Sequence, residues 1–94
     1  MNNFNEDIEQ LREEIDSLDI ELISILAQRI RVVEAVGKKK TEYGLKPFDR
    51  KRWKIVLNSR IALGKEAGLS LVLVRSIFII LHRHSLYIQK RLRL

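Results

Sequence analysis

The stretch that decides the fold is IEQLREEIDSLDIELISILAQRIRVVEAV, residues 8–36. Its apolar residues recur every three or four positions, which is the spacing of one face of an α-helix. They are Ile8, Leu11, Ile15, Leu18, Leu22, Ile25, Val32, Val33 and Val36. Arg29 stands in this series where an apolar residue is expected. A cation on a buried stripe lowers stability unless an anion meets it, so Arg29 predicts either an acidic partner or an anionic ligand.

The chain as a whole predicts an all-α fold, with one long helix and two shorter ones forming a single domain over residues 1–94. The long helix covers about residues 5–43, and a loop with the only proline follows at 44–48. The second helix covers about 49–67 and the third about 71–91. Helical spacing of apolar residues continues through all three segments.

The expected ends of these helices follow from capping residues. Asp49 and Ser70 are the expected N-caps of the second and third helices, and Gly68 is the expected stop of the second. Gly37 lies inside the long helix and is expected to weaken it only slightly. The apolar side of the second helix comprises Trp53, Val56, Leu57, Ile61 and Leu63. The stripe of the third comprises Leu71, Val74, Ile77, Phe78, Leu81, Ser85, Ile88, Gln89 and Leu92.

The helix lengths predict a second chain. The long helix would extend ~54 Å, and the two shorter ones ~28–32 Å each. The shorter helices cannot cover the whole apolar stripe of the long one. We therefore expect a two-fold homodimer, which is the commonest way to bury such a remainder.

Composition bounds the function. The chain has no cysteine, which excludes disulfides and cysteine-ligated metals. It carries 18 basic and 12 acidic residues, for a net charge of +6, and the acidic residues crowd the first 21 positions. A basic excess suits nucleic acid, an anionic membrane or a small anionic substrate. No apolar run approaches the ~20 residues of a membrane span, and residues 1–7 do not resemble a signal peptide, so we expect a cytoplasmic protein.

Four polar residues interrupt the apolar stripes: Arg29, Lys40, Ser85 and Gln89. Arg29 and Lys40 are eleven positions apart, so they return to within about 20° of one helix face, ~16 Å apart, and their long side chains can converge on one small object. Ser85 and Gln89 are neighbours one turn apart on the third helix. Arg12 is ~25 Å from Arg29 and on another face.

A two-fold axis would bring Arg12 to the same place. If two long helices pair antiparallel and cross near residues 18–22, position 12 of one helix lies opposite position 29 of the other. Arg52 lies in the first turn of the second helix, where anions are favoured, just after Asp49. Such a site would bind a small molecule with two negative charges and stabilise developing charge on it. The site itself contains no nucleophile.

Each of these residues also has a purely structural interpretation. Arg29 could pair with an acid such as Asp19, and Arg12 could be a surface charge. Lys40 could belong to a solvated run of lysines, and Asp49 could act only as an N-cap. Ser85 and Gln89 could be a satisfied polar pair in the core. The sequence alone leaves these alternatives open.

Taken in order, the residues resemble the AroQ class of chorismate mutases, whose members are all-helical. The long helix carries this resemblance through residues 11–16, 18–19 and 26–29, and again through 36–40. The Pro47-Phe48-Asp49 loop with Arg52 is similar to the start of the family's second helix. Residues 68–70, 74–78, Ser85 and Gln89 are similar to its third. The similarity is collinear and covers about residues 8–90.

The resemblance implies an intertwined homodimer with two shared active sites, which catalyses the Claisen rearrangement of chorismate to prephenate in phenylalanine and tyrosine biosynthesis. It implies no cofactor and no metal. It implies chorismate as the ligand and no binding of nucleic acid or membrane. From the length of the chain we also expect a monofunctional enzyme, because 94 residues leave no room for a fused dehydratase, dehydrogenase or regulatory domain.

The resemblance also implies roles for individual residues. Arg29 and the Arg12 of the partner chain would clamp the two carboxylates, with Arg52 and Ser85 supporting them. Lys40 and Gln89 would donate hydrogen bonds to the ether oxygen, and Asp49 would bind the ring hydroxyl. The sequence departs from the family at Trp53, where a glutamate is frequent, and at His84, where an acidic residue is common.

Three other functions stay open. An isochorismate-pyruvate lyase shares the fold, and Trp53 keeps that activity in view, although the Phe48-Asp49 loop favours the mutase. A basic helical module that binds nucleic acid would use residues 38–40 and 90–93, but it does not explain cations on apolar stripes. A regulatory subunit with a degenerate pocket would fold and dimerise without turnover.

Overall fold

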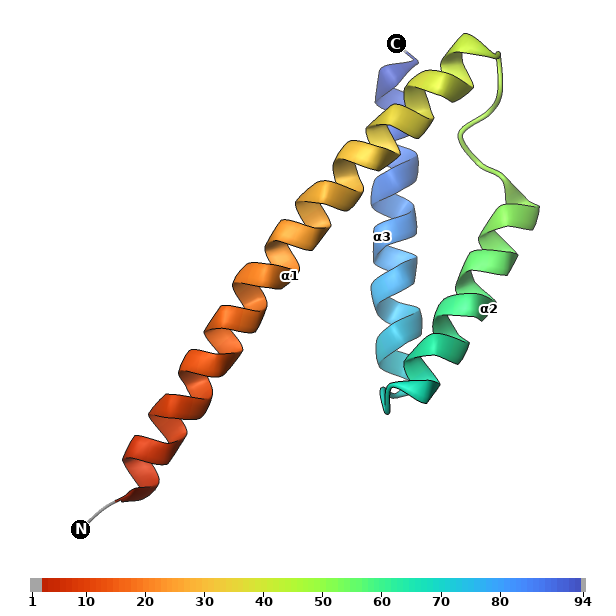
Figure 1. Ribbon diagram of the computed structural model, residues 1–94. Helices are drawn as coiled ribbons and strands as arrows, with labels where there is room; N and C mark the ends of the chain where they lie inside the picture. Colours follow the sequence, from red (N-terminus) through yellow and green to blue (C-terminus); the bar gives the residue numbers. More distant parts are fainter. Residues whose placement is uncertain (1–2, 94) are drawn as a thin grey trace. The chain divides into compact units, whose positions relative to one another are not determined.

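The computed structural model describes residues 3–93, and these form three α-helices with no strand (Figure 1). Helix α1 covers Asn3–Glu42, α2 covers Arg50–Glu66 and α3 covers Leu71–Leu92. The predicted all-α class is confirmed. The chain divides into two compact units, Met1–Val32 and Val33–Leu94, so the last turns of α1 belong with α2 and α3.

Helix α1 begins two residues earlier than expected and ends one residue earlier, at Glu42. Its end is set by Gly44, whose φ of 67° suits a residue without a side chain. The N–H of Leu45 donates to the Lys40 carbonyl at 2.7 Å, and that of Gly44 donates to Thr41 at 3.2 Å. This pair of bonds is a Schellman motif, which turns the chain out of the helix and satisfies carbonyls of its last turn.

Helices α2 and α3 have the caps that the sequence predicts. The Asp49 side chain accepts the N–H of Arg52, and the Ser70 side chain accepts the N–H of Leu73 at 3.1 Å. Between the helices, Gly68 has a φ of 81°. The N–H of Leu69 donates to the Gly64 carbonyl at 2.8 Å, which completes a second Schellman motif.

Helices α2 and α3 form an antiparallel pair (Figure 1). At one end the Trp53 and His82 rings stack, and in the middle the Arg60 guanidinium lies over the Phe78 ring at 6.0 Å. Towards the turn the backbone of Gly64 lies against Val74, which is 4% exposed.

One residue of the predicted apolar side is misplaced, because Leu63 is 59% exposed. The half-buried positions of α2 are Trp53, Val56, Leu57, Ser59, Arg60 and Ile61, with Gly64 buried. At ~100° per residue, position 63 lies at the edge of this stripe, about 20° from position 56. The arginine at 60 extends the stripe because its aliphatic stem can lie along apolar surface.

The last turns of α1 approach α3 through Gly37, which is buried. A Cβ atom at this position would lie 2.8 Å from a Leu92 methyl carbon and 3.1 Å from Cγ of Gln89. The glycine that the sequence predicted to be a mild weakness in α1 is therefore the point at which α3 approaches the α1 backbone.

The apolar stripe of the first unit is uncovered in the single chain. Leu11, Ile15, Leu18, Leu22 and Ile25 are each more than half exposed. Exposed apolar stripes of this length are rare on a stable monomer.

Helix α3 is long and apolar enough to cross a membrane by length and composition alone, with 11% of its most apolar stretch buried. This corrects the expectation that no stretch approaches a span, because Arg75 and Arg83 interrupt the apolar runs without making the helix polar on average. A single helix of this composition is weak evidence for a membrane span, since a core helix of a soluble protein has the same composition.

The contact between Gly64 and Val74 makes a specific prediction. In an ordinary helix, Gly→Ala stabilises by ~1 kcal/mol. At position 64 the new Cβ would overlap a Val74 methyl group, so we expect Gly64→Ala to lower the free energy of unfolding by about 1–2 kcal/mol. Urea unfolding at fixed protein concentration measures the change.

The control is the same substitution in a Val74→Ala background, where the overlap is removed. There Gly64→Ala should stabilise, and the two changes should show a favourable coupling energy. Stabilisation by Gly64→Ala in the parent chain would refute the close approach of α2 and α3 at this point.

Candidate active site

Lys40 is the first element of the candidate site, and its surroundings differ from those of the lysines beside it. Lys38 and Lys39 are exposed, whereas Lys40 is half-buried. Its ammonium donates to the Pro47 carbonyl at 2.7 Å, so it holds the loop between α1 and α2. An ammonium has three donors, so this bond is compatible with a second acceptor such as a ligand oxygen. The interpretation of Lys40 as part of a solvated run does not fit this environment.

Asp49 and Arg52 stand at the N-terminus of α2. The Asp49 carboxylate accepts the backbone N–H of Arg52 at 3.1 Å, and both side chains are exposed. A carboxylate has two oxygens with several acceptor positions, so the N-cap role leaves capacity to receive a hydroxyl proton. The helix terminus places partial positive charge beside this carboxylate, as expected for a site that handles anions.

Ser85 and Gln89 are the buried polar residues of α3, at 8% and 7% exposure. The Ser85 hydroxyl donates to the Leu81 carbonyl one turn back at 2.8 Å. The Gln89 side-chain oxygen is buried and has no hydrogen-bond partner in the described chain. Since a buried acceptor without a donor is unfavourable, Gln89 indicates a place where a bound molecule could supply the donor.

Lys40, Asp49 and Gln89 come from three elements of the second unit, whereas a meeting of the Arg52 and Ser85 side chains with them stays a prediction. Lys40 and Asp49 line one concavity of about 340 Å³, together with Leu45, Lys46, Phe48, Arg50 and Lys51. Gln89 lies against Gly37, which is one helical turn before Lys40 on the same face of α1. The end of α1, the start of α2 and the last turns of α3 thus bring two donor residues and one carboxylate to one end of this unit.

Two arginines of the candidate site belong to the first unit. Arg29 is half-buried. Arg12 is exposed and pairs with Glu9 one turn earlier, at 2.7 Å. An exposed pair of this kind contributes little to stability, so Arg12 can exchange its partner at low cost. Convergence of these two arginines with the residues of the second unit stays a prediction.

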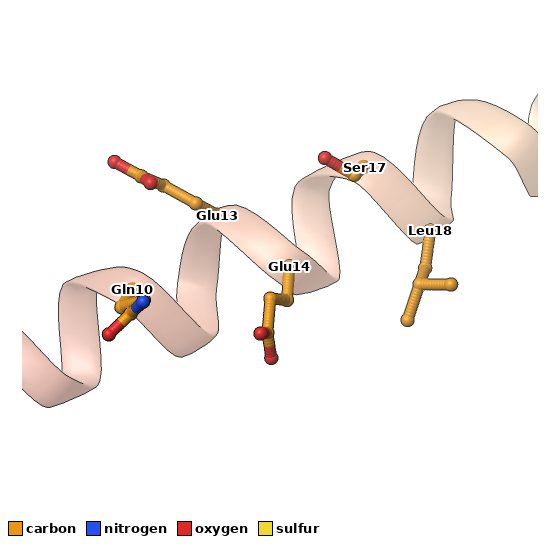
Figure 2. A pocket seen from close by; sticks show the side chains of 5 residues that line it. All are labelled: Gln10, Glu13, Glu14, Ser17 and Leu18. Atoms are coloured by element: carbon orange, nitrogen blue, oxygen red, sulfur yellow. The ribbon is translucent and has the colours of Figure 1, made fainter.

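Helix α1 also has an open face within the first unit. Figure 2 shows Gln10, Glu13, Glu14, Ser17 and Leu18 on successive turns of a single helix, with the two glutamates pointing away from each other. Side chains that diverge from one helix do not enclose a small molecule. Because the face is acidic, it also does not suit an anionic ligand.

The sequence interpretation missed a cluster of three rings beside Asp49. The His82 imidazole stacks on the Trp53 indole with ring centroids 3.8 Å apart, and Phe48 lies 5.8 Å from His82 in a tilted arrangement. The sequence did contain a signal for the Phe48 and Trp53 part of this cluster. Apolar residues just before an N-cap and four positions after it form a hydrophobic staple. His84, by contrast, is exposed and stacks on Tyr87 with centroids 6.1 Å apart.

Comparison with known proteins identifies the fold. Residues 11–90 match the family described as chorismate mutase type II. The chain belongs to this family. Chorismate mutases are isomerases, and the AroQ-class resemblance seen in the sequence is confirmed. The chain is also 39% identical over 75 residues to a protein of Haemophilus influenzae named T-protein, a match that covers 80% of this chain and 20% of that relative. It therefore spans about a fifth of the relative's length.

The unpartnered side-chain oxygen of Gln89 predicts that removing it will stabilise the folded protein. Gln89→Met keeps the shape of the side chain but removes the buried acceptor, so we expect the free energy of unfolding to rise by about 1 kcal/mol. The matched control is Gln28→Met on the exposed face of α1, which should change stability by less than ~0.5 kcal/mol. Both are measured by urea unfolding. A marked loss of stability for Gln89→Met alone would mean that the oxygen has a donor in the folded protein.

Proposed function

We propose that the chain is a chorismate mutase that converts chorismate to prephenate. The observation that carries the proposal is a buried amide with an orphan oxygen, Gln89, which lies against α1 one turn from Lys40 in a chain of this family. The reaction breaks one C–O bond and forms one C–C bond within the same molecule. It needs a folded substrate conformer and stabilisation of negative charge on the ether oxygen, but no nucleophile.

The residues on the ether side act as donors. Lys40 donates one proton to the Pro47 carbonyl and directs another to the ether oxygen. The Gln89 amide N–H₂ donates to the same oxygen, while its own oxygen accepts from a donor that arrives with the complete site. Two fixed donors in a buried position stabilise the charge of the transition state more strongly than water, because they need no reorientation.

The residues on the ring side bind and orient chorismate. Asp49 accepts the ring hydroxyl, Arg52 supports the carboxylate side and Ser85 supports the ring carboxylate. Arg29 and the partner's Arg12 grip the two carboxylates in the forked geometry that guanidinium groups favour. Clamping both ends of a flexible anion lowers the entropy cost of reaching the reactive conformer.

We infer a homodimer in which each site draws on two chains. The exposed stripe of α1 supports this, and so does the distribution of charge. Residues 1–32 hold eight of the twelve acidic residues but only three of the eighteen basic ones. The acidic segment of one chain is thus electrostatically complementary to the basic segment of another.

We propose a soluble, cytoplasmic enzyme that does not bind nucleic acid or membrane. The polar residues of α3 argue against a membrane span, since Ser85 and Gln89 are buried on the protein side of the helix. Lys40 is one of the basic residues that could attract nucleic acid, but its ammonium already donates a hydrogen bond to the Pro47 carbonyl in the loop. The apolar remainder of α3 suits the core of a helical dimer.

One observation favours a second activity, isochorismate-pyruvate lyase. Trp53 stands directly after Arg52, where the family often has a glutamate. Its indole stacks on the His82 ring. This leaves Asp49 as the acceptor for the ring hydroxyl. The Phe48-Asp49 loop favours the mutase, so the lyase remains the alternative.

The test is to present chorismate and isochorismate separately to the purified chain. We expect loss of the ring absorbance of chorismate with prephenate as the product. Salicylate and pyruvate formed from isochorismate at a higher efficiency would identify the lyase instead. No turnover of either substrate by a folded protein would indicate a regulatory subunit.

The shared site predicts complementation between two inactive variants. Arg12→Ala and Arg29→Ala should each lower kcat/KM by about 100-fold or more, because each removes one arm of the clamp. When the two variants are mixed under conditions that allow subunit exchange, they form heterodimers. In each heterodimer one active site carries both substitutions and the other active site carries neither. Statistical exchange makes half of the dimers mixed, so activity should recover to about a quarter of the parent's.

The control is Arg12→Ala mixed with itself under the same exchange conditions, which should recover nothing. If exchange is demonstrated by mass spectrometry and the mixture stays inactive, the partner's Arg12 is not part of the site.

A further inference from the structure

Three rings from three segments meet beside the candidate hydroxyl acceptor. Phe48 comes from the loop, Trp53 from the first turns of α2 and His82 from the middle of α3. The planes of Trp53 and His82 are 11° apart, with centroids 3.8 Å apart, which is face-to-face stacking. Phe48 approaches the same imidazole at 5.8 Å with its plane tilted by 57°. The imidazole is therefore the shared member of both contacts.

The positions of Phe48 and Trp53 relative to the cap explain what this contact fastens. Asp49 is the N-cap, so Phe48 precedes it by one residue and Trp53 follows it by four. Side chains at these two positions ordinarily touch in a hydrophobic staple, which fixes the direction of the chain as it enters a helix. Here an imidazole from another helix contacts both of them, so the entry to α2 is tied to α3 as well.

Asp49 lies between the two fastened positions. Its carboxylate holds the first turn of α2 through the N–H of Arg52, and its exposed side chain lines the concavity shared with Lys40. Any rotation of the α2 N-terminus relative to α3 would move Asp49 with respect to Ser85 and Gln89. The ring contacts oppose that rotation because planar groups in contact have few alternative packings.

We propose that His82 is a positioning residue for Asp49: its imidazole, held between Trp53 and Phe48, fixes the α2 N-terminus against α3. This rests on the proposed function, in which Asp49 receives the ring hydroxyl. It also gives Trp53 a role in this chain, since the indole provides a stacking surface at the position where the family resemblance leads us to expect a carboxylate. Asp49 then binds the hydroxyl as a single acceptor held in a defined place.

The first arm of the test measures the stack without any substrate. Trp53 is the only tryptophan, so the indole bands of the near-ultraviolet circular dichroism spectrum report its surroundings alone. His82→Leu removes the stacked ring and should lose most of this signal, while the far-ultraviolet spectrum stays helical. His82→Phe keeps a flat ring and should retain the signal. His84→Leu is the matched control, because that histidine is exposed on the same helix, and should leave the signal unchanged.

The second arm measures kinetics with chorismate. Asp49 contacts the hydroxyl in both substrate and transition state, so a displaced Asp49 should raise KM with little change in kcat. We expect His82→Leu to raise KM by about three- to tenfold, the value of one hydrogen bond. His82→Phe and His84→Leu should stay within about twofold of the parent. A change confined to kcat, or a KM equally raised in His82→Phe, would overturn the positioning role.

The two arms separate failure of this inference from failure of the proposed function. If the parent chain does not turn over chorismate, the proposed function fails, and the spectra of Trp53 then decide alone whether His82 fixes the α2 N-terminus. If the parent is active and His82→Leu changes neither the indole signal nor KM, the inference is wrong and the mutase assignment stands.

Discussion

Burial of the apolar stripe of α1 is the constraint on which the rest of the structure depends. The helix continues from Asn3 to Glu42, and its part within residues 3–32 exposes a row of leucine and isoleucine side chains in the single chain. Each fully buried side chain of this size stabilises a fold by roughly 1.5–3 kcal/mol. Burial of the whole stripe would therefore add substantially to the free energy of unfolding. A second copy, whose basic segment complements this acidic one, is the occupant that we infer.

The same constraint accounts for the charges on the apolar faces. A cation or amide in such a position lowers stability unless a partner meets it. Lys40 has the Pro47 carbonyl, and Ser85 has the Leu81 carbonyl, but the Gln89 oxygen has no donor in the described chain. A chain that retains an unsatisfied group at its most buried polar position sacrifices some stability there, which is characteristic of functional sites. We interpret that position as the centre of the mutase reaction.

Local chemistry made much of the fold predictable. The glycines and caps between the helices follow rules of backbone geometry that depend on a few neighbouring residues, so Asp49, Gly68 and Ser70 were interpreted correctly from the sequence. The helical spacing of Ser85 and Gln89 likewise predicted their burial. The assignment of Leu63 failed because this position lies at the edge of the α2 stripe, where helical spacing alone does not decide whether a side chain is buried.

Contacts between distant segments were not predictable in the same way. No local rule pairs Trp53 with His82, and the role of Gly37 emerges only where α3 approaches it. The place of Arg12 in the site depends on a second chain, so neither the sequence nor a single chain determines it. The most direct measurement is turnover of chorismate per chain during dilution, with molecular mass followed by sedimentation. A shared site predicts that turnover per chain and mass fall together as dimers dissociate, whereas a monomer with undiminished turnover would contradict it.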